Sequence, residues 1–338
     1  MLSHSPLAEL QGDVFPTLYS TLVSEALVDR VLTQYDIPQV TRCHFWHRGL
    51  SDVYLVNTAE ADFVLRVSHR HWRSTEDVLF ELELLEFLHD RGVPIAHPVR
   101  THDGRLAIEL QAPEGIRAAA LFVYAPGEIP LGDLSTTQSW QLGTALAQVQ
   151  RYAQDFSSKF GRDELNLEYL LDRSMGTIAP FLQHSTQEYD YVRGVFDELH
   201  TSLQGLPTTA PHWTICWGDP HSGNAHFTPE GTVTMFDFDQ CGYGWRAFDL
   251  AKFLNVSMRT GISLKVREAF LGGYQSVEPI EPFEVEALQS LTLAAHFWSW
   301  AIAVNAARVH NYSRLDDTYF TRRVAQIKRL RSKDWQLF

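Results

Sequence analysis

The stretch CWGDPHSGNAHFTPEGTVTMFDFDQCGYG, residues 216–244, places a group of polar side chains between and after two hydrophobic runs. The runs WTIC and TVTMFDF have the composition of buried β-strands, and turn-forming residues separate them. Strands bounded by turns hold side chains in fixed positions, so polar residues at their ends form a candidate functional site. Those residues are Asp219, His221, Asn224, His226, Asp237 and Asp239.

Three of these side chains have the chemistry of a magnesium site. Asp219, Asn224 and Asp237 offer two carboxylates and an amide, which are hard oxygen donors of the kind that bind Mg²⁺. A hairpin turn at TPEGT would bring Asp237 back beside the loop that carries the other two. Phosphoryl transfer uses such a site, with one further carboxylate that orients the attacking hydroxyl. The alternative is that Asp219 and Asn224 are turn residues and Asp237 is a helix cap.

The histidines allow a second alternative, a zinc site of a hydrolase. His221, His226 and His212 could bind zinc together with Asp237, because imidazole nitrogens and carboxylates are common zinc ligands. However, the sequence contains no HxxxH or HExxH helix, and PHSGN is typical of a loop. We expect His226 to be an interior strand residue with a hydrogen-bonded ring.

Composition and charge restrict the class of protein. The chain has 338 residues, 45% of them hydrophobic, which is enough for a large core in two domains or one bilobal unit. A formal net charge of −13 argues against a nucleic-acid or membrane-surface partner. Three cysteines without a CxxC pair suit a reducing compartment, and residues 1–30 show no signal peptide, so we expect a cytoplasmic protein. The apolar segment 291–307 is interrupted by polar residues, which predicts a buried helix and no membrane span.

The pattern of elements predicts two lobes and an α+β fold. Residues 41–124 contain mostly strand-like runs, interrupted by one helix that begins at a capping box of Ser74 and Asp77 and ends before Gly92 and Pro94. After the turn APGE the periodicity becomes helical. We therefore expect a small β-rich lobe over residues 1–124, with residues 1–40 as a helical extension, and a larger helical lobe over residues 125–338. A cleft between two lobes is a common ligand site.

The small lobe also presents a charged pair. On the run FVLRV, strand alternation points Arg66 away from the face that carries Phe63 and Leu65. Glu81 shares the apolar face of the following helix, whereas Glu83 points elsewhere. A carboxylate on an inward face needs a cation, so we predict that Arg66 and Glu81 meet.

The motifs WGDPHSGN and FDFD, followed by WRAFDLA, resemble those of the aminoglycoside phosphotransferase and choline kinase superfamily, relatives of protein kinases. The N-terminal detail is most similar to the branch of stress response kinase A and type II homoserine kinase-like proteins. The resemblance implies a bilobal protein-kinase-like fold with Asp219 as catalytic base or hydroxyl-orienting residue and Asn224 and Asp237 as Mg²⁺ ligands. Asp249 would steady the catalytic loop, with His221 also in a supporting position. Asp239 would assist the metal, or it could simply be a solvated turn carboxylate. Trp217 stands where the family has histidine.

The resemblance also implies a nucleotide site in the small lobe. Gly49 and Ser51, in HRGLSDVYLV, occupy the position of the family's phosphate-covering loop, although the full GxGxxG is missing. Arg66 and Glu81 would correspond to the Lys–Glu pair of kinases. Adenine would bond to the backbone of three successive residues, Phe122, Val123 and Tyr124.

The expected function is ATP- and Mg²⁺-dependent transfer of the γ-phosphate to a hydroxyl. The acceptor could be an aminoalcohol, homoserine, an aminoglycoside-like sugar or protein Ser/Thr. Acidic residues late in the chain could attract a cationic acceptor or could simply be solvated: Glu284, Glu286, Asp316 and Asp317. The alternative function is a catalytically inactive nucleotide-binding or interaction module, which the presence of Asp219, Asn224 and Asp237 disfavours.

Overall fold

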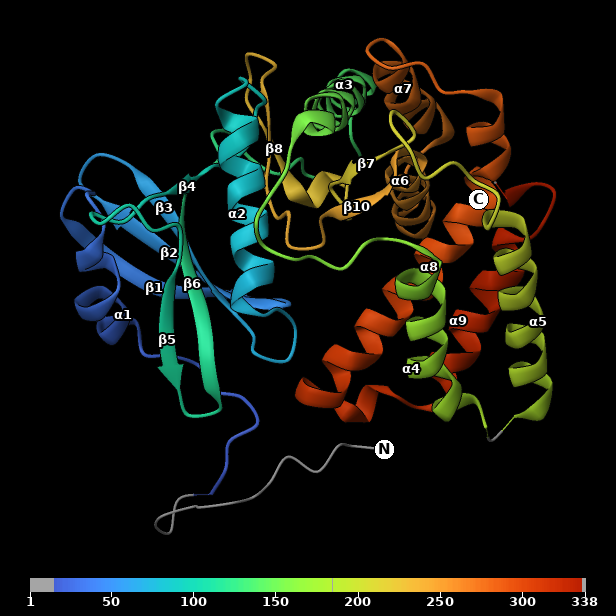
Figure 1. Cartoon of the computed structure of the whole chain (residues 1–338), viewed down its shortest axis with the longest axis horizontal. Coiled ribbons are helices and arrows are strands. Elements are labelled where there is room, and N and C mark those ends of the chain that lie inside the picture. Colours follow the sequence, from blue (N-terminus) through green and yellow to red (C-terminus); the bar gives the residue numbers. More distant parts are fainter. Residues whose placement is uncertain (1–14, 184, 336–338) are drawn as a thin grey trace.

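The computed structural model describes residues 15–183 and 185–335, and it has two lobes side by side (Figure 1). The small lobe contains an antiparallel sheet of strands of different lengths, and the large lobe is mostly helical. Of the predicted helical extension, residues 1–14 lie outside the described residues. Within residues 15–40, helix is limited to α1 (Ser24–Arg30) and a short 3-10 turn at Leu32–Gln34.

The sheet of the small lobe has the strand order β1-β2-β3-β6-β4, with β5 paired to the other part of β6. Alternation along β3 directs Phe63, Leu65 and Val67 into a core that α1 covers, and Arg66 to the opposite face. This opposite face looks toward the large lobe, with α2 between them (Figure 1). The strands are β1 (Val40–Arg48), β2 (Ser51–Thr58), β3 (Asp62–Ser68), β4 (Pro98–Val99), β5 (Ile108–Ala112) and β6 (Gly115–Val123).

Helix α2 (Thr75–His89) begins and ends where the sequence predicts. The Ser74 side chain accepts a hydrogen bond from the Asp77 amide, and the Asp77 side chain accepts one from the Ser74 amide, which confirms the capping box. After the helix, Gly92 has a φ of 74°, the left-handed conformation that glycine adopts at low cost. Buried leucines along α2 fix its rotation, and therefore fix which of its acidic residues face the lobe interior.

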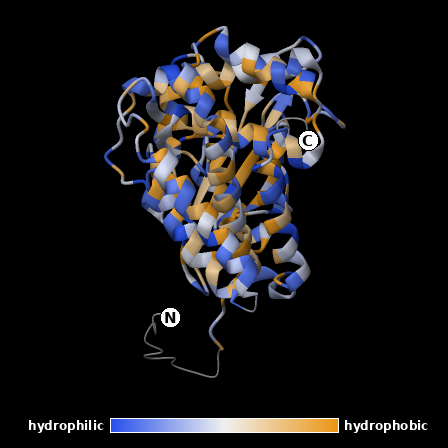
Figure 2. Cartoon of the chain, turned by 90° about the vertical axis from the view of Figure 1, so that its right-hand side faces the viewer, coloured by the Kyte–Doolittle hydropathy of each residue, from blue (hydrophilic) through white to orange (hydrophobic). Residues whose placement is uncertain are grey.

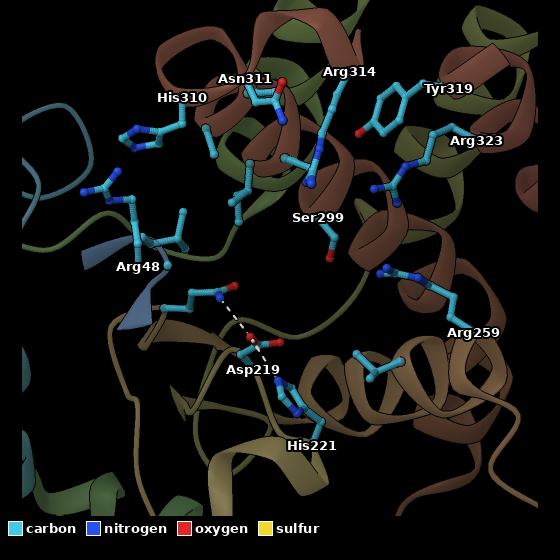
Figure 3. A pocket seen from close by; sticks show the side chains of 18 of the residues that line it. Arg48, Asp219, His221, Arg259, Ser299, His310, Asn311, Arg314, Tyr319 and Arg323 are labelled. Carbon is cyan, nitrogen blue, oxygen red and sulfur yellow. Dashed lines mark hydrogen bonds and ion pairs between the residues drawn. The ribbon is translucent and has the colours of Figure 1, made fainter. Parts of the chain in front are cut away.

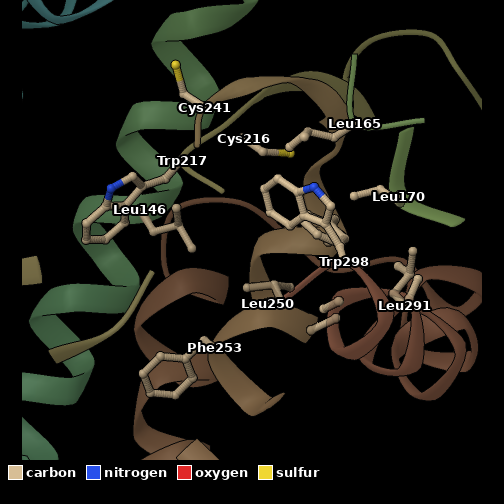
Figure 4. Packing of buried hydrophobic residues seen from close by; sticks show 14 of the residues in the cluster. Leu146, Leu165, Leu170, Cys216, Trp217, Cys241, Leu250, Phe253, Leu291 and Trp298 are labelled. Carbon is tan, nitrogen blue, oxygen red and sulfur yellow. The ribbon is translucent and has the colours of Figure 1, made fainter. Parts of the chain in front are cut away.

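The large lobe packs its helices around α8 (Pro282–His310), whose middle is buried on nearly all sides. Hydrophobic residues gather along the centre of this lobe (Figure 2), and Trp217, Phe253 and Trp298 are among the side chains that fill it (Figure 4). No helix in the described part of the chain is long and apolar enough to cross a membrane. The other helices are α3 (Thr136–Tyr152), α4 (Arg173–Leu182), α5 (Thr186–Leu203), α6 (Arg246–Thr260), α7 (Leu264–Gln275) and α9 (Asp317–Leu330).

Two small antiparallel sheets hold the polar segment 216–244 against these helices. Strand β7 (Trp213–Cys216) pairs with β10 (Gly242–Trp245), and β8 (Ala225–Phe227) pairs with β9 (Val233–Met235) across the TPEG turn. The polar residues follow β7 and β9, so both loops emerge at the cleft between the lobes.

Candidate active site

A buried carboxylate on α6 holds the backbone of the loop after β7. Asp249, on α6, accepts hydrogen bonds from the backbone amides of Trp217 and Gly218, both at 2.8 Å, and from the Gln150 side chain. Gly218 has a φ of 86°, and a Cβ there would lie 2.2 Å from the carbonyl oxygen of Gln240, so only glycine fits. Complete burial raises the pKa of Asp249 to about 6 against the opposing effect of these donors. Asp249 thus contacts the loop as the sequence resemblance implies.

Asp219 lies at the end of this loop and lines a cavity of about 640 Å³ (Figure 3). Its carboxylate accepts a hydrogen bond from Gln240 at 2.9 Å and lies 3.4 Å from the Lys252 ammonium and 3.5 Å from the His221 ring. Burial opposes ionisation, but Lys252 and His221 more than offset it and hold the pKa of Asp219 well below its usual range. Asp219 is therefore ionised at neutral pH and available as a hydrogen-bond acceptor.

The two predicted metal ligands lie on adjoining segments. The Asn224 side-chain amide donates to the Asp219 carbonyl at 3.1 Å, and the Asn224 carbonyl accepts from the amide of Phe236, directly before Asp237. Asp237 has a φ of 58°, which is uncommon for a residue other than glycine and often marks a functional position. The surrounding protein atoms and the negative charge of Asp239 raise the pKa of the Asp237 carboxyl above its usual range, although 48% of its side chain is exposed to solvent, which weakens the effect of burial. Such crowded negative charge, beside an amide oxygen, suits a bound divalent cation.

Arg66 connects the small lobe to this metal loop. Its guanidinium lies 2.5 Å from Glu81 and 3.6 Å from Asp237, and it packs over the Phe122 ring. The Glu81 side chain is buried, and its second oxygen has no hydrogen-bond partner among the described residues. Glu83 instead accepts from the Ser158 hydroxyl. The structure therefore brings together the two residues that strand and helix periodicity select.

Trp217, which the family pattern would make histidine, joins the two loops. Its indole N–H is shared between the carbonyls of Phe236 and Asp237, at 3.2 and 3.1 Å, and its ring stacks on Phe238. The tryptophan is fully buried. Trp217 thus makes a packed contact between the loop that carries Asp219 and the loop that carries Asp237, although its identity alone did not predict these hydrogen bonds.

Asp239 is a buried anchor and not a solvated turn carboxylate, which was the alternative from sequence. Its carboxylate accepts from the Trp72 indole at 2.9 Å, and its carbonyl accepts from Arg73 and Arg162. Trp72 and Arg73 belong to the small lobe, so Asp239 ties the lobes together beside the metal loop. Sequence reasoning missed these donors because they lie far from Asp239 along the chain.

Lys252 and Gln240 are further site residues that sequence reasoning missed. Lys252 is buried and bonds to Ser299 at 3.0 Å and to Gln240 at 3.4 Å, beside Asp219. A signal for Lys252 was present, because it lies three residues after Asp249 in FDLAK and so on the same side of α6. Gln240 had no comparable local signal.

The segments expected to bind the nucleotide differ in their position at the cavity and in whether their hydrogen-bonding groups are already engaged within the protein. Gly49 lies in the β1–β2 turn and lines the same cavity as Asp219, and a Cβ there would make only ordinary contact with His47. Ser51 is buried at the start of β2. The amides of Val123 and Tyr124 already donate to the carbonyls of His97 and Asp62, at 3.1 and 3.3 Å. These two amides are therefore engaged within the protein, so adenine would need a rearrangement to bond to them, and the expected contact with the backbone of residues 122–124 stays a prediction.

The zinc alternative finds no support in the geometry. His226, in β8, points its ring to the carbonyl of Ala125 at 2.7 Å, which confirms the expected interior strand histidine. His212 lies 3.4 Å from Glu284, away from the loop, and Nδ1 of His221 accepts from the Gly223 amide. In the described ranges, the histidines of the zinc hypothesis do not form a cluster with Asp237.

Comparison with known proteins gives the family. The sequence pattern of the phosphotransferase enzyme family matches residues 44–288. An uncharacterised protein of Synechocystis sp. is 52% identical, over 99% of this chain and 92% of its own length. A homoserine kinase of Xanthobacter autotrophicus is 26% identical, over 81% of this chain and 84% of its own.

Solved structures share the fold. A microcompartment-associated aminopropanol kinase superposes with a TM-score of 0.76 at 21% identity, covering 92% of this chain and 99% of its own. An amicoumacin kinase in complex with AMP-PNP and Ca²⁺ gives a TM-score of 0.73 at 19% identity, covering 90% of this chain and 93% of its own. The chain therefore belongs to the phosphotransferase enzyme family, and it is a kinase with a protein-kinase-like bilobal fold.

Proposed function

We propose that this kinase uses ATP and Mg²⁺ to phosphorylate a hydroxyl group of an acceptor bound over Asp219. The observation that carries the proposal is the position of Asp219, an ionised carboxylate on the wall of a 640 Å³ cavity, in contact with Asn224, while Asp237 lies on the adjoining segment of chain. The complex of an amicoumacin kinase with AMP-PNP and Ca²⁺ supports a nucleotide and a divalent cation in this fold. Homoserine kinases and an aminopropanol kinase among the relatives favour a small-molecule acceptor over a protein.

Each side chain has a distinct task in this proposal. Asp219 accepts a hydrogen bond from the acceptor hydroxyl and orients it, and its low pKa makes it a positioning group more than a strong proton acceptor. Arg66, held by Glu81, faces the triphosphate and compensates its negative charge. Asn224 and Asp237 would hold Mg²⁺, which when bound neutralises charge on the transferring phosphate. Asp249 and Trp217 keep the two loops in register.

The direct test replaces the orienting carboxylate. Asp219→Asn should reduce phosphoryl transfer by about 10²–10⁴-fold while nucleotide affinity stays near that of the parent. Transfer is measured as ADP release with a panel of hydroxyl compounds, and nucleotide affinity by titration with AMP-PNP. Glu230→Gln, an exposed carboxylate change in the β8–β9 turn, is the matched control. Near-normal turnover of Asp219→Asn would remove this residue from the role.

A second test addresses the metal. Asp237→Ala should abolish the increase in ATP affinity that Mg²⁺ gives to the parent, because the ion's charge makes the triphosphate tolerable beside these carboxylates. Equal enhancement by Mg²⁺ in variant and parent would refute the metal assignment. Tight nucleotide binding by the parent, without transfer to any acceptor or to water, would favour the inactive module.

A further inference from the structure

The cavity over Asp219 is strongly positive. Apart from Asp219 itself, no carboxylate lines it among the described residues. Five cationic side chains do so, and they come from the end of β1, α6, the α8–α9 connection and α9: Arg48, Lys252, Arg259, Arg314 and Arg323. A cavity with this balance of charge attracts anions and repels cations.

Three of these cations have no carboxylate partner in the described part of the chain. Arg48 lies 3.4 Å from Asp52, and Lys252 lies 3.4 Å from Asp219, so their charges are partly compensated. Figure 3 shows the guanidinium groups of Arg259, Arg314 and Arg323 directed into the space across from Asp219. No ion pair with Asp or Glu forms at any of them within the described ranges.

The acidic residues considered from sequence lie elsewhere. Glu284 is paired with Arg246 at 2.6 Å, and Asp316 caps α9 by accepting from the Tyr319 amide. Neither these residues nor Glu286 and Asp317 line the cavity. The expectation that they attract a cationic acceptor to this site therefore has no structural basis.

We propose that the phosphate acceptor carries a carboxylate or phosphate group in addition to its hydroxyl. The inference rests on the proposed function, because it places the acceptor in the cavity over Asp219. The anionic group would lie against Arg259 and Arg323, whose planar guanidinium groups match carboxylate and phosphate oxygens with paired hydrogen bonds. The hydroxyl would then reach Asp219. An acceptor whose only charge is an ammonium would be repelled by the same arginines.

The test uses four probes with one carbon skeleton: glycerate, glycerol 3-phosphate, glycerol and 3-amino-1,2-propanediol. Their binding is measured by ligand-observed NMR on protein saturated with Mg²⁺ and AMP-PNP, which occupies the nucleotide site. We expect at least one anionic probe to bind more tightly than the neutral and ammonium probes. Arg259→Gln and Arg323→Gln should each reduce this preference by roughly tenfold, the value of one charge-assisted hydrogen bond. Arg193→Gln, an exposed change on α5, is the control.

The outcomes separate this inference from the proposed function. Asp219→Asn should keep the preference for anions in binding and lose transfer. If the parent binds the anionic probes preferentially but transfers phosphate to no acceptor, the proposed function is wrong and the anion site is supported. Equal or tighter binding of the ammonium probe, no binding of either anion, or a preference that survives both arginine changes would overturn the anion site.

A second cluster, which borders the cavity described above through His310, joins the two lobes. His69 and His71 follow β3 in the small lobe, and His310 is the last residue of α8 in the large lobe. One ring nitrogen from each lies within 4.8 Å of the others, and the ring centroids are 5.2 to 5.4 Å apart. Spacing of this kind brings three imidazole ligands to one point.

The hydrogen bonding of His69 prepares it as a ligand. Its Nε2 lies 3.2 Å from Asp52, which Arg117 holds at 2.8 Å, so Nε2 carries the proton and donates. Its Nδ1 is buried and has no hydrogen-bond partner among the described residues, and the same holds for Nε2 of His310. An imidazole fixed by a carboxylate on one nitrogen, with a free lone pair on the other, is the usual state of a metal-ligating histidine.

We propose that His69, His71 and His310 bind a Zn²⁺-like transition-metal ion across the lobes, with water as the fourth ligand. Nitrogens around tetrahedral zinc are about 3.3–3.5 Å apart, given Zn–N bonds of about 2.0–2.1 Å, and the exposed His71 side chain can rotate to close the remaining distance. Asp52 and Glu114 compensate the nearby Arg48 and Arg117 charges. The ion would connect β3 to the end of α8.

Titration with Zn²⁺ in excess Mg²⁺, and the visible spectrum of the Co²⁺ form, test this site without any activity assay. We expect one equivalent to bind with a tetrahedral Co²⁺ spectrum, and His71→Ala or His310→Ala to weaken binding at least tenfold. His102→Ala, an exposed histidine away from the cluster, should leave it unchanged. Unaltered affinity in both cluster variants, or an octahedral spectrum alone, would refute the site.

Discussion

Arg66 is the side chain at which the sheet, helix α2 and the metal loop meet. Its guanidinium contacts Glu81 and lies 3.6 Å from Asp237, so it holds one group in the small lobe and one in the large lobe. A guanidinium can bond to a carboxylate and a phosphate at once, whereas an ammonium has no such planar fork. In the proposed function, the residue would therefore link nucleotide charge to the position of α2.

A double-mutant cycle measures this link. Arg66→Ala and Glu81→Gln should each lower kcat/KM for ATP, and the double variant should lose less than the sum of the two single losses because the side chains share one contact. Arg66→Lys should lie between parent and Arg66→Ala. Glu83→Gln is the control on the same helix, since Glu83 bonds to Ser158 instead. Strictly additive losses would show that the pair does not act together.

Asp249 makes stability depend on pH in a defined direction. Burial raises the pKa of Asp249 to about 6, above that of the unfolded chain, so the native state binds its proton more tightly. The stability that this group contributes is complete below the unfolded pKa and is lost as pH rises through about 6. Asp249 thus holds the loop that carries Asp219, but the free energy of unfolding falls as the pH rises toward neutrality because the buried carboxyl must then ionise.

Comparison with Asp249→Asn isolates this effect. The free energy of unfolding of the parent minus that of the variant should shrink by up to about 3 kcal/mol between about pH 4 and about pH 7. Urea unfolding followed by tryptophan fluorescence gives the two curves. Glu230→Gln should show a nearly constant difference. A constant difference for Asp249→Asn as well would mean that its pKa is not raised.

At the scale of elements, α3 and α7 cross so closely that two glycines are required. A Cβ on Gly143 would lie 2.0 Å from the carbonyl oxygen of Phe270, and one on Gly273 would lie 2.0 Å from that of Trp140. Figure 1 shows the two helices side by side. The Thr144 hydroxyl, which donates to the Gly273 carbonyl, adds a polar contact at the crossing.

Alanine at this crossing should therefore destabilise the protein. Gly143→Ala should cost about 1–2 kcal/mol of unfolding free energy, because overpacking of about 2–3 kcal/mol outweighs the roughly 1 kcal/mol gain in helix propensity. Gly194→Ala, in α5 with nothing within 4 Å of its Cβ, should stabilise slightly. Thermal and urea unfolding give the stability of both variants relative to the parent. Equal behaviour of the two variants would contradict the close crossing.

Local sequence signals predicted the helices and strands, whereas contacts between residues far apart in the chain determine which side chains line the cavity over Asp219. The capping box of α2 and the alternation along β3 are read from neighbouring residues, so the fold class and the Arg66–Glu81 contact were accessible from sequence. Arg259, Arg314 and Arg323 come from separate elements, and only tertiary packing directs them into one cavity. The charge of the acceptor site therefore had no local signature.

At the scale of the whole molecule, the lobes are held together along one side of the cleft. The loop after α2 pairs with β9, where Ala96 donates to the Met235 carbonyl and Met235 donates to the Pro94 carbonyl, both at 2.9 Å. Nearby, the Trp72 indole donates to the carboxylate of Asp239. These contacts place the surface of the sheet that carries Arg66 opposite the loops that carry Asp219 and Asp237.

Arg162 is the buried centre of this connection. Its guanidinium donates to the carbonyls of Asp77, at the start of α2, and Cys241, both at 2.8 Å, and also to that of Asp239. Removing it takes a buried donor away from carbonyls of both lobes, although Asp239 keeps Arg73, and each group left unsatisfied costs about 1–3 kcal/mol. Arg173, on α4, offers a matched comparison because its ion pairs with Asp163 and Glu168 are exposed.

We expect Arg162→Ala to lower the free energy of unfolding by roughly 3 kcal/mol or more, and Arg173→Ala by about 1 kcal/mol or less. Hydrogen exchange should locate the difference, with faster exchange at the start of α2 and in the loop before β10 in Arg162→Ala only. KM for ATP should rise in the same variant, because the nucleotide contacts both lobes. If both variants lost the same stability, or exchange rose evenly over the protein, Arg162 would not be the residue that holds the lobes in register.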